Sequence, residues 1–287
     1  MKFLSFMNEG KATFGAVTGA GVVDLGKRHN ELRDLREAIR MDQLDALARE
    51  ASSADADFDL ADIEYLPTIT NPEKIICIGV NYANRNEEYK DGSSAPKYPS
   101  VFMRSRESLV GHQQSIMDPP ESEQLDYEGE IVIIIGKAGR RISQDDAHKH
   151  IAGLTIMNEG SVRDYLRHAK FNVTQGKNFA NSGSLGPWLV TPDEIDTTGQ
   201  LQVITRINGE ERQNDETSNL MFPFRYLISY LSTFYQLKPG DVIATGTPNG
   251  AGARFDPPKY LKDGDVVEVE VPGIGILHNT IVTETVD

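Results

Sequence analysis

Residues 131–135, which read Ile-Val-Ile-Ile-Ile, constrain the fold more than any other part of the sequence. The run is too short for a typical helix and is apolar on both faces, which predicts a central strand buried on both sides. Side chains of a strand alternate between its faces, so acidic residues at every second position just before the run are predicted to share one face. These residues are Asp126, Glu128 and Glu130, followed on the same face by Val132 and Ile134.

Carboxylates that converge beside a buried face indicate a metal site. They repel one another and lose hydration, so they need protons, paired Lys or Arg side chains, or a cation. Oxygen ligands without Cys or paired His favour Mg²⁺ or Mn²⁺, with Ca²⁺ as a third option, over Zn²⁺. The alternative is a strand end whose acidic groups are simply solvated. Gly129, between the two glutamates, favours a site, because a glycine inside a strand often lets another group approach the backbone.

Length and charge limit the partners. The chain has 287 residues, enough for one large domain or for one domain with a smaller appendage, and its formal net charge is −14 at pH 7. This charge disfavours nucleic acid and anionic membrane surfaces as partners, so an anionic substrate would need a local basic pocket or a metal. No segment approaches the roughly 20 apolar residues of a membrane span.

Cysteine use and the N-terminus predict the compartment. The only cysteine, Cys77, lies in an apolar run and is predicted to be a buried strand residue rather than a nucleophile. One cysteine cannot form an internal disulfide, which fits a reducing compartment. Residues 1–6 lack the apolar core of a signal peptide. We therefore expect a cytoplasmic protein.

The pattern of apolar residues changes near residue 68. Residues 1–68 are predicted to form a small N-terminal domain, with strands at 2–6, 12–17 and 21–25 and helices at 32–40 and 43–51. Residues 69–287 are predicted to form a second domain, in which strand patterns outnumber helical ones. The strands are predicted at 75–78, 101–103, 131–135, 154–157, 185–190, 202–207, 242–245 and 266–271, and the helices at 84–90, 145–151, 161–167 and 222–233. This mixture predicts an α+β fold with a largely antiparallel or mixed sheet.

The glycine-rich segment 245–252 resembles a phosphate-binding loop only superficially. Such a loop opens a helix, whereas Pro257 and Pro258 follow here and forbid one. Two interpretations remain, a plain tight turn or a turn that exposes Thr245, Thr247 and backbone amides to a small oxyanion. Lys177 lies in a partial match to a nucleotide loop, and taken alone it is expected to be a surface residue.

A set of short motifs follows in order from residue 74 to the C-terminus. They are Ile78-Gly79-Val80-Asn81-Tyr82, Val101-Phe102-Met103, Asp126-Tyr127-Glu128-Gly129-Glu130, Asn158-Glu159, Arg163-Asp164, Gly176-Lys177, Leu185-Gly186-Pro187-Trp188, Lys238-Pro239-Gly240-Asp241-Val242-Ile243, Gly246-Thr247-Pro248 and Leu261-Lys262-Asp263-Gly264-Asp265. Each motif alone is weak, but the ordered set resembles the fumarylacetoacetate hydrolase family. The resemblance implies a small N-terminal domain, a rolled mixed β-sheet, usually a homodimer, and a divalent cation held by three carboxylates.

The resemblance also implies roles for individual residues. Glu128, Glu130 and Glu159 match the metal ligands, although the family commonly has Asp at the third position. Both side chains are hard oxygen ligands, so we expect coordination to survive. Lys177 matches a lysine that contacts the substrate or the developing oxyanion. The groups that match substrate-positioning residues are Tyr127, Gly246 and Thr247.

One departure from the family pattern bears on the reaction. Family hydrolases generally carry a His and a Glu three residues apart that activate the attacking water, and these positions hold Arg85 and Glu88 here. Arginine cannot accept a proton at neutral pH. Either Glu88 aided by Arg85 is the base, or another group or a metal-bound water takes this role, or the reaction needs no water. Arg85 could equally bind a substrate carboxylate, as could Arg104, where many relatives have Lys.

The resemblance thus implies a metal-dependent enzyme acting on a small keto acid. The leading hypothesis is hydrolysis of a carbon–carbon bond in a 1,3-diketo acid of the acylpyruvate kind, such as maleylpyruvate or fumarylpyruvate, in aromatic or sugar-acid catabolism. The cation and Lys177 would stabilise the pyruvate enolate that leaves. The alternative is an isomerase, decarboxylase or hydratase of 2-hydroxymuconate-type dioates, which the missing His favours. A binding protein without activity is a third hypothesis, against which the retained carboxylates and lysine argue.

Overall fold

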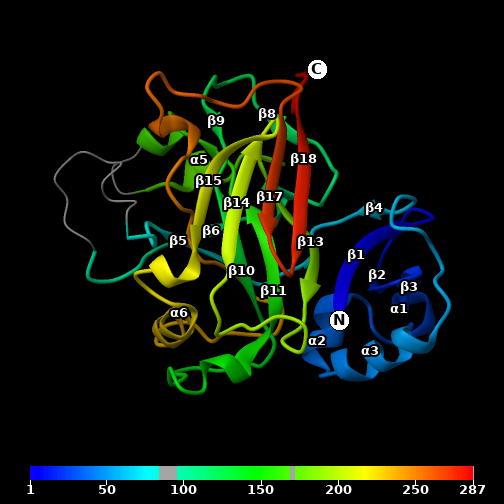
Figure 1. Cartoon of the computed structure of the whole chain (residues 1–287). Helices are drawn as coiled ribbons and strands as arrows, with labels where there is room; N and C mark the ends of the chain where they lie inside the picture. The colour runs from blue at the N-terminus through cyan, green and yellow to red at the C-terminus, as the bar shows by residue number, and fades with distance from the viewer. Residues whose placement is uncertain (84–95, 169–171, 287) are drawn as a thin grey trace.

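The computed structural model describes residues 1–83, 96–168 and 172–286, and an eleven-stranded mixed sheet forms its centre (Figure 1). The strands run in the order β3-β2-β1-β13-β11-β10-β16-β5-β6, with β4 beside β1 and β7 beside β13. Their bounds are β1 Lys2–Asn8, β2 Lys11–Thr18, β3 Gly21–Asp24, β4 Glu64–Tyr65, β5 Ile75–Gly79, β6 Ser100–Arg104, β7 Leu109–Val110, β10 Gly129–Ile135, β11 Ile151–Asn158, β13 Gly183–Val190 and β16 Val242–Ala244. The predicted α+β class with a mixed sheet is confirmed.

Strand β10 lies in the buried interior of this sheet, as its β-branched run predicts. All seven of its residues are buried, and it pairs antiparallel with β11 on one side and β16 on the other. Ile131, Ile133 and Ile135 belong to the larger hydrophobic core, and Val132 and Ile134 to the core on the opposite face. Strand β10 therefore contributes side chains to both cores. Each of these side chains contributes about 1.5–3 kcal/mol when fully buried.

A second, five-stranded sheet packs on the face of β10 that carries Ile131 and Ile133. Its order is β15-β14-β17-β18-β8, with β8 Ile116–Asp118, β14 Gln202–Ile207, β15 Glu210–Glu216, β17 Val266–Val271 and β18 Gly275–Thr283. A Cβ on Gly129 would lie 2.1 Å from Thr205 Oγ1 and 2.9 Å from Val269 Cγ1. What approaches the backbone of Gly129 is therefore the second sheet, and the interpretation of this glycine as an opening for a ligand is wrong.

The helices are short and lie outside the sheets. They are α1 Leu25–Arg28, α2 Leu35–Arg40, α3 Leu44–Ser53, α5 Thr174–Lys177 and α6 Phe224–Leu231, with 3₁₀ turns η1 Arg106–Ser108, η2 Ala147–His150, η3 Tyr165–Arg167, η4 Thr217–Asn219 and η5 Gly252–Arg254. Helix α2 begins at Leu35 because Asp34 caps it, with Oδ1 accepting a hydrogen bond from the Glu37 N–H at 2.7 Å. Helix α6 lies within the predicted 222–233.

Two predicted helices are wrong, and one cannot be compared. Residues 145–151 contain only η2, which leads directly into β11. Residues 161–167 contain η3 and the short strand β12 Ser161–Val162, which pairs with β9 Leu125–Asp126. Of the apolar residues in these segments, Ile151 and Val162 pair in strands, whereas Ala147, Tyr165 and Leu166 lie in the 3₁₀ turns. The helix predicted at 84–90 falls outside the described residues.

The segment 1–68 continues the main sheet at the edge of β13. Lys2 pairs with Val190 and Phe3 with Leu189, and the blue elements in Figure 1 extend from this edge. Phe3 also shares a hydrophobic core with Val132 of β10. The predicted boundary between residues 1–68 and 69–287 therefore does not separate two cores, and as a domain boundary it stays a prediction.

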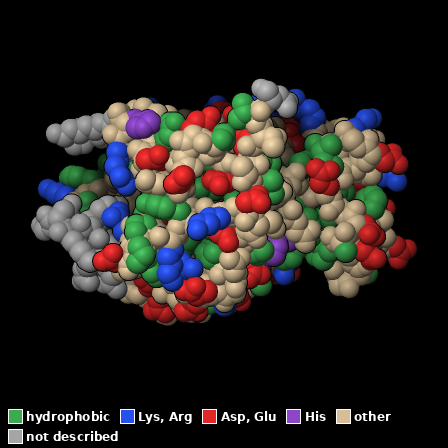
Figure 2. Space-filling view, turned by 90° about the horizontal axis from the view of Figure 1, so that it is seen from above, with side chains coloured by type: hydrophobic (Ala, Val, Ile, Leu, Met, Phe, Trp, Pro, Cys, Tyr) green, Lys and Arg blue, Asp and Glu red, His purple; other side chains and the backbone are tan. Residues whose placement is uncertain are grey.

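Charged side chains of both signs cover the surface. On the face shown in Figure 2, the Lys and Arg side chains of the described residues lie in small groups among Asp and Glu.

Cys77 is buried in β5, as predicted. Within the described ranges, no helix has the length and apolar character needed to cross a membrane.

Candidate metal and active site

Three glutamates meet where β10 begins and β11 ends. Glu130 is the second residue of β10, Glu128 directly precedes this strand, and Glu159 directly follows β11. Gly129 pairs with Asn158 across the two antiparallel strands, so the start of one lies beside the end of the other. One carboxylate oxygen from each glutamate lies within 4.8 Å of the other two, and all three residues are buried. The structure thus brings together the three residues expected to be metal ligands.

Backbone contacts hold Glu128 against the end of β11. The Glu128 N–H donates to Asn158 Oδ1 at 3.0 Å, and the Glu159 N–H donates to the Glu128 carbonyl at 2.7 Å. Because both polar groups of the Glu128 backbone are engaged by two consecutive residues, the spacing between Glu128 and Glu159 is fixed.

Lys177, the last residue of α5, bridges two of the three carboxylates. Its Nζ lies 2.6 Å from Glu128 Oε2 and 3.2 Å from Glu159 Oε2, and the residue is only 4% exposed. Burial lowers the pKa of Lys177, but the charges of Glu128 and Glu159 outweigh this effect and leave it raised. Lys177 is therefore a buried ammonium group in the cluster and not a surface residue.

Arg163 forms a second cationic contact, with Glu128 and with Asp126. Its Nε donates to Asp126 Oδ2 at 2.7 Å, and its Nη2 lies 2.7 Å from Glu128 Oε1. Asp126 also accepts hydrogen bonds from the backbone N–H groups of Gly252 and Ala253, at 2.8 and 3.0 Å. The expectation that Asp126 shares a face with the glutamates is wrong, because the chain leaves β9 after Asp126 and starts β10 only at Gly129.

The remaining oxygens of the cluster fit a divalent cation. Glu159 Oε1 is buried without a hydrogen-bond donor, and Arg104 Nη1 lies 3.6 Å from it. Burial, together with the charges of Glu159 and Glu128, raises the pKa of Glu130 well above its usual range. Three converging carboxylates of this kind are stabilised by a hard cation, and their chemistry matches the preferences of Mg²⁺, Mn²⁺ and Ca²⁺.

Arg104 makes hydrogen bonds to protein groups, and its expected role in binding substrate stays a prediction. Its Nε donates to Ser108 Oγ at 3.0 Å, Nη1 to the Gly160 carbonyl at 2.7 Å and Nη2 to Ser182 Oγ at 3.2 Å. The guanidinium is buried and lies beside Glu159. Arg104 therefore fixes the segment that carries Glu159.

The groups expected to position substrate make structural contacts. Tyr127 is fully buried in the larger core and its hydroxyl donates to the Gly250 carbonyl at 2.9 Å, so its substrate-positioning role stays a prediction. The Gly246 N–H donates to Glu130 Oε2 at 2.8 Å, so it orients a carboxylate rather than facing an oxyanion. Thr247 donates to the Gly129 carbonyl at 3.0 Å, and Thr245 donates to the Ile131 carbonyl at 2.8 Å.

The predicted base positions cannot be placed, because Arg85 and Glu88 lie outside the described residues. Among the residues that are described, the cluster of potential ligands contains no histidine. Sequence reasoning did not single out Arg163 or Gln213 as site residues, although both contact the segment 126–130 through their side chains.

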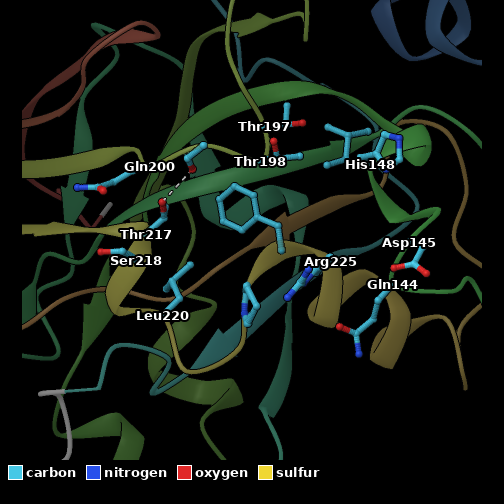
Figure 3. A pocket seen from close by; sticks show the side chains of 14 residues that line it. Gln144, Asp145, His148, Thr197, Thr198, Gln200, Thr217, Ser218, Leu220 and Arg225 are labelled. Atoms are coloured by element: carbon cyan, nitrogen blue, oxygen red, sulfur yellow. Dashed lines mark hydrogen bonds between the residues drawn. The ribbon is translucent and has the colours of Figure 1, made fainter.

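A cavity of about 640 Å³ lies elsewhere on the molecule, over η2, η4 and the start of α6 (Figure 3). Phe224 and Ile151 contribute apolar walls, and polar side chains such as His148, Thr198 and Arg225 surround them. Ile151 is the first residue of β11, whereas Glu159 follows its last. An eight-residue strand spans roughly 25 Å, so this cavity is separate from the carboxylate cluster.

Comparisons with known proteins agree with the fold. The family model for the C-terminal domain of fumarylacetoacetate (FAA) hydrolase matches residues 74–282. The chain is 40% identical over 227 residues to oxaloacetate tautomerase YisK of Bacillus subtilis, covering 78% of this chain and 75% of that protein. It is 38% identical over 271 residues to the mitochondrial oxaloacetate tautomerase fahd2 of Xenopus laevis, covering 92% and 83%.

Among solved structures, the fumarylacetoacetate hydrolase from Exiguobacterium antarcticum superposes with a TM-score of 0.83 at 32% identity, covering 99% of this chain and all of that one. The matched family model includes the three glutamates and Lys177, and it spans well over half of the chain. The chain therefore belongs to the fumarylacetoacetate hydrolase family.

Proposed function

We propose that the protein is a metal-dependent isomerase that interconverts the keto and enol forms of a short 2-oxo dicarboxylate, with oxaloacetate as the first substrate to test. The observation that carries this proposal is a buried ammonium, Lys177, beside three carboxylates in a cluster that includes no histidine among the described residues. The two tautomerases at 40% and 38% identity support the same class of reaction. The reaction belongs to the isomerase class of the alternative above, with oxaloacetate in place of a 2-hydroxymuconate-type dioate, and this class is preferred here over hydrolysis.

Tautomerisation needs less machinery than hydrolysis. One proton leaves C3, the C2–C3 double bond forms, and the C2 oxygen gains a proton, so no water is consumed. A His/Glu pair that activates water is therefore not required. Glu128, Glu130 and Glu159 would hold a divalent cation, which supplies electrostatic stabilisation of the enolate when bound.

We expect Lys177 to act on the developing charge. Its raised pKa keeps the ammonium protonated, so it donates hydrogen bonds and does not act as a base. A fixed donor in a buried site stabilises an enolate oxygen more than water does. Among the described residues, Asp126 and the three glutamates lie close to Arg104, Arg163 and Lys177, which makes four carboxylates and three cations. A divalent cation would bring the summed charge of these described groups to one positive charge, which suits an anionic substrate.

The test is a direct assay of enol oxaloacetate. The absorbance of the conjugated enol is followed with Mg²⁺ or Mn²⁺, with chelator, and with the variant Glu130→Gln. We expect the wild-type protein with metal to accelerate the decay well beyond the same metal in buffer, and the chelated protein and the variant to lose the effect. Equal rates with wild-type protein and with buffer would contradict the proposal.

A second candidate is hydrolysis of an acylpyruvate, such as maleylpyruvate or fumarylpyruvate. The observation that favours it is the likeness to the Exiguobacterium fumarylacetoacetate hydrolase along almost the whole chain. NMR analysis of products from a panel of acylpyruvates and 2-hydroxymuconate-type dioates separates the candidates. Release of pyruvate with a second carboxylic acid indicates hydrolysis, whereas conserved mass with a moved double bond indicates an isomerase.

We also propose that the protein acts as a homodimer, as the family resemblance implies. Size-exclusion chromatography with light scattering checks this directly. A mass near twice the 31.8 kDa of one chain is expected, and a monomer at micromolar concentration would contradict it.

A further inference from the structure

Gln213 is a buried amide on an otherwise polar edge strand. It lies in β15, which reads Glu-Glu-Arg-Gln-Asn-Asp-Glu, and it is the only buried residue of this strand. Gln213 is 1% exposed, and its side chain points from the second sheet toward Gly129 of the main sheet. Burying an amide costs free energy unless its hydrogen bonds are made, so the contacts of Gln213 decide its role.

The amide closes a ring of hydrogen bonds around Gly129. The Gly129 N–H donates to Gln213 Oε1 at 3.0 Å, Gln213 Nε2 donates to Thr247 Oγ1 at 2.9 Å, and the Thr247 hydroxyl donates to the Gly129 carbonyl at 3.0 Å. The second proton of the amide goes to the Pro248 carbonyl, also at 2.9 Å. Gln213 and Thr247 each accept one hydrogen bond of the ring and donate another. Linked hydrogen bonds polarise one another, which strengthens all three.

This ring holds the residue that separates two of the three candidate metal ligands. Glu128 and Glu130 flank Gly129, and their carboxylates converge only while the backbone at Gly129 keeps its orientation. The same ring fixes the loop after β16, whose Gly246 N–H donates to Glu130 Oε2 at 2.8 Å. Gln213 therefore constrains Glu130 from two directions without touching it.

The close packing of the two sheets makes this contact feasible. Gly129 has no side chain, and a Cβ there would meet Thr205 Oγ1 at 2.1 Å. Thr205 is the residue that leaves no room for a side chain at position 129, and it pairs directly with Gln213 across β14 and β15. The close approach of Thr205 to Gly129 therefore also brings the amide of Gln213 within hydrogen-bonding distance of Gly129.

We propose that Gln213 is a positioning residue for the carboxylates that bind the metal, an inference that rests on the metal-dependent function proposed above. It acts through Gly129 and Thr247 and contacts neither the metal nor the substrate. Groups that orient metal ligands typically change metal affinity by 10- to 100-fold when they are removed.

The experiment compares Gln213→Met with a matched control in the full chain. Methionine keeps the length of the side chain and removes the amide. Asn279→Leu is the control, because Asn279 is an equally buried amide on β18 that holds the carbonyls of Gly111 and Gln114, both at 2.8 Å. Mn²⁺ affinity is measured by calorimetry, the Mn²⁺ environment by electron paramagnetic resonance, and the melting temperature on metal-free protein.

We expect Gln213→Met to weaken Mn²⁺ binding by at least tenfold and to change the Mn²⁺ spectrum. Asn279→Leu is expected to lower the melting temperature while leaving Mn²⁺ affinity within twofold of wild type. Equal affinity losses in the two variants, or wild-type affinity in Gln213→Met, would overturn the proposal. Failure of the wild-type chain to bind Mn²⁺ would overturn it too.

A second pair of variants covers the case in which Gln213→Met does not fold. Thr247→Val removes the hydroxyl from the ring at constant size, and Thr247→Ser retains it. Thr247→Val is expected to weaken Mn²⁺ binding and Thr247→Ser to restore it; equal affinities in the two would overturn the ring as the cause. Because these measurements contain no keto acid, a wild-type protein that binds Mn²⁺ but leaves oxaloacetate unchanged contradicts the proposed reaction and not the role of Gln213.

Discussion

At the scale of single residues, we expect Lys177 to affect metal binding and turnover in opposite directions. Its ammonium bridges Glu128 and Glu159 and so relieves the repulsion between them, but it would also repel a cation that binds to the same oxygens. We therefore expect that metal affinity does not require Lys177. In the proposed reaction its charge is needed where negative charge develops on the substrate oxygen.

Replacing Lys177 with Met should therefore separate the two effects. We expect kcat to fall by about 10²–10³, the loss seen when one donor to an oxyanion is removed, while Mn²⁺ affinity stays equal or increases. Steady-state kinetics and calorimetry on the same preparation check this. Parallel loss of metal binding and activity would instead identify Lys177 as a structural part of the cluster.

Glu130 is expected to lower the stability of the metal-free protein although metal binding requires it. Burial, with the neighbouring charges of Glu159 and Glu128, raises its pKa, so its ionised form destabilises the metal-free protein. Glu130→Gln should raise the melting temperature of metal-free protein by roughly 2–4 °C, the shift that about 1 kcal/mol causes in a domain of 150–250 residues. It should also abolish the stabilisation that Mn²⁺ gives to the wild type. A variant that is less stable without metal and still stabilised by Mn²⁺ contradicts this assignment.

At the scale of elements, the contact between the two sheets depends on one missing side chain. A methyl group on Gly129 would overlap Thr205 and Val269, both from the second sheet. We expect Gly129→Ala to destabilise the protein by about 1–3 kcal/mol, the usual cost of overpacking a core, and to weaken metal binding. Urea unfolding measures the first effect. Gly19→Ala is the control, because nothing lies within 4 Å of its Cβ position. An effect on the unfolded chain alone would stabilise the Gly19→Ala variant slightly, so a similar loss of stability there would show that overlap with the second sheet is not the cause.

Sequence patterns predict the elements whose buried residues are apolar and recur at the spacing of a strand or a helix. The run 131–135 and the amphipathic helix α6 are of this kind. Strand β15 could not be recognised in the same way, because its only buried residue is polar. The helix expected at 145–151 is wrong: residues 147–150 form the 3₁₀ turn η2, and Ile151 already pairs with Ile135 in the sheet.

The residues of the candidate site also fall into those that the sequence identified and those that it did not. The resemblance identified three glutamates and a lysine that the structure brings together. It did not identify Arg163 or Gln213, whose contacts join residues 37 and 84 positions apart. Residue type also says nothing about direction, so Arg104 and Tyr127 were expected to face the substrate although both side chains bond to protein groups.

At the scale of the whole molecule, a half-buried histidine links the N-terminal segment to the second sheet. The ring of His112 lies 4.7 Å from that of Tyr65 in β4, and its Nδ1 accepts a hydrogen bond from the His278 N–H in β18 at 3.0 Å. Burial, and to a lesser extent the charge of His278, lowers the pKa of His112 to about 4. His278 in turn lies 3.4 Å from Glu268.

This lowered pKa predicts a loss of stability in acid. Between pH 6.5 and 4 the unfolded chain binds a proton that the folded His112 does not, so stability falls as the pH drops through this window. His112→Asn keeps an acceptor but does not titrate there. We expect the melting temperature of the wild type to fall more steeply from pH 7 to pH 5 than that of the variant, as measured by differential scanning calorimetry. Identical slopes would show that other groups cause the acid sensitivity.

The pairing of β1 with β13 also has a consequence for synthesis. The first residue of the chain contacts Thr191, 190 positions later. Among the described residues, the earlier partners along the same edge of β1 are residues 64–66, which pair with Ser5, Phe6 and Met7. At 5–20 residues per second a ribosome needs roughly 10–40 s to reach that partner strand. During this time the start of β1 is an open strand edge on the nascent chain, able to pair with other chains until β13 emerges and closes it.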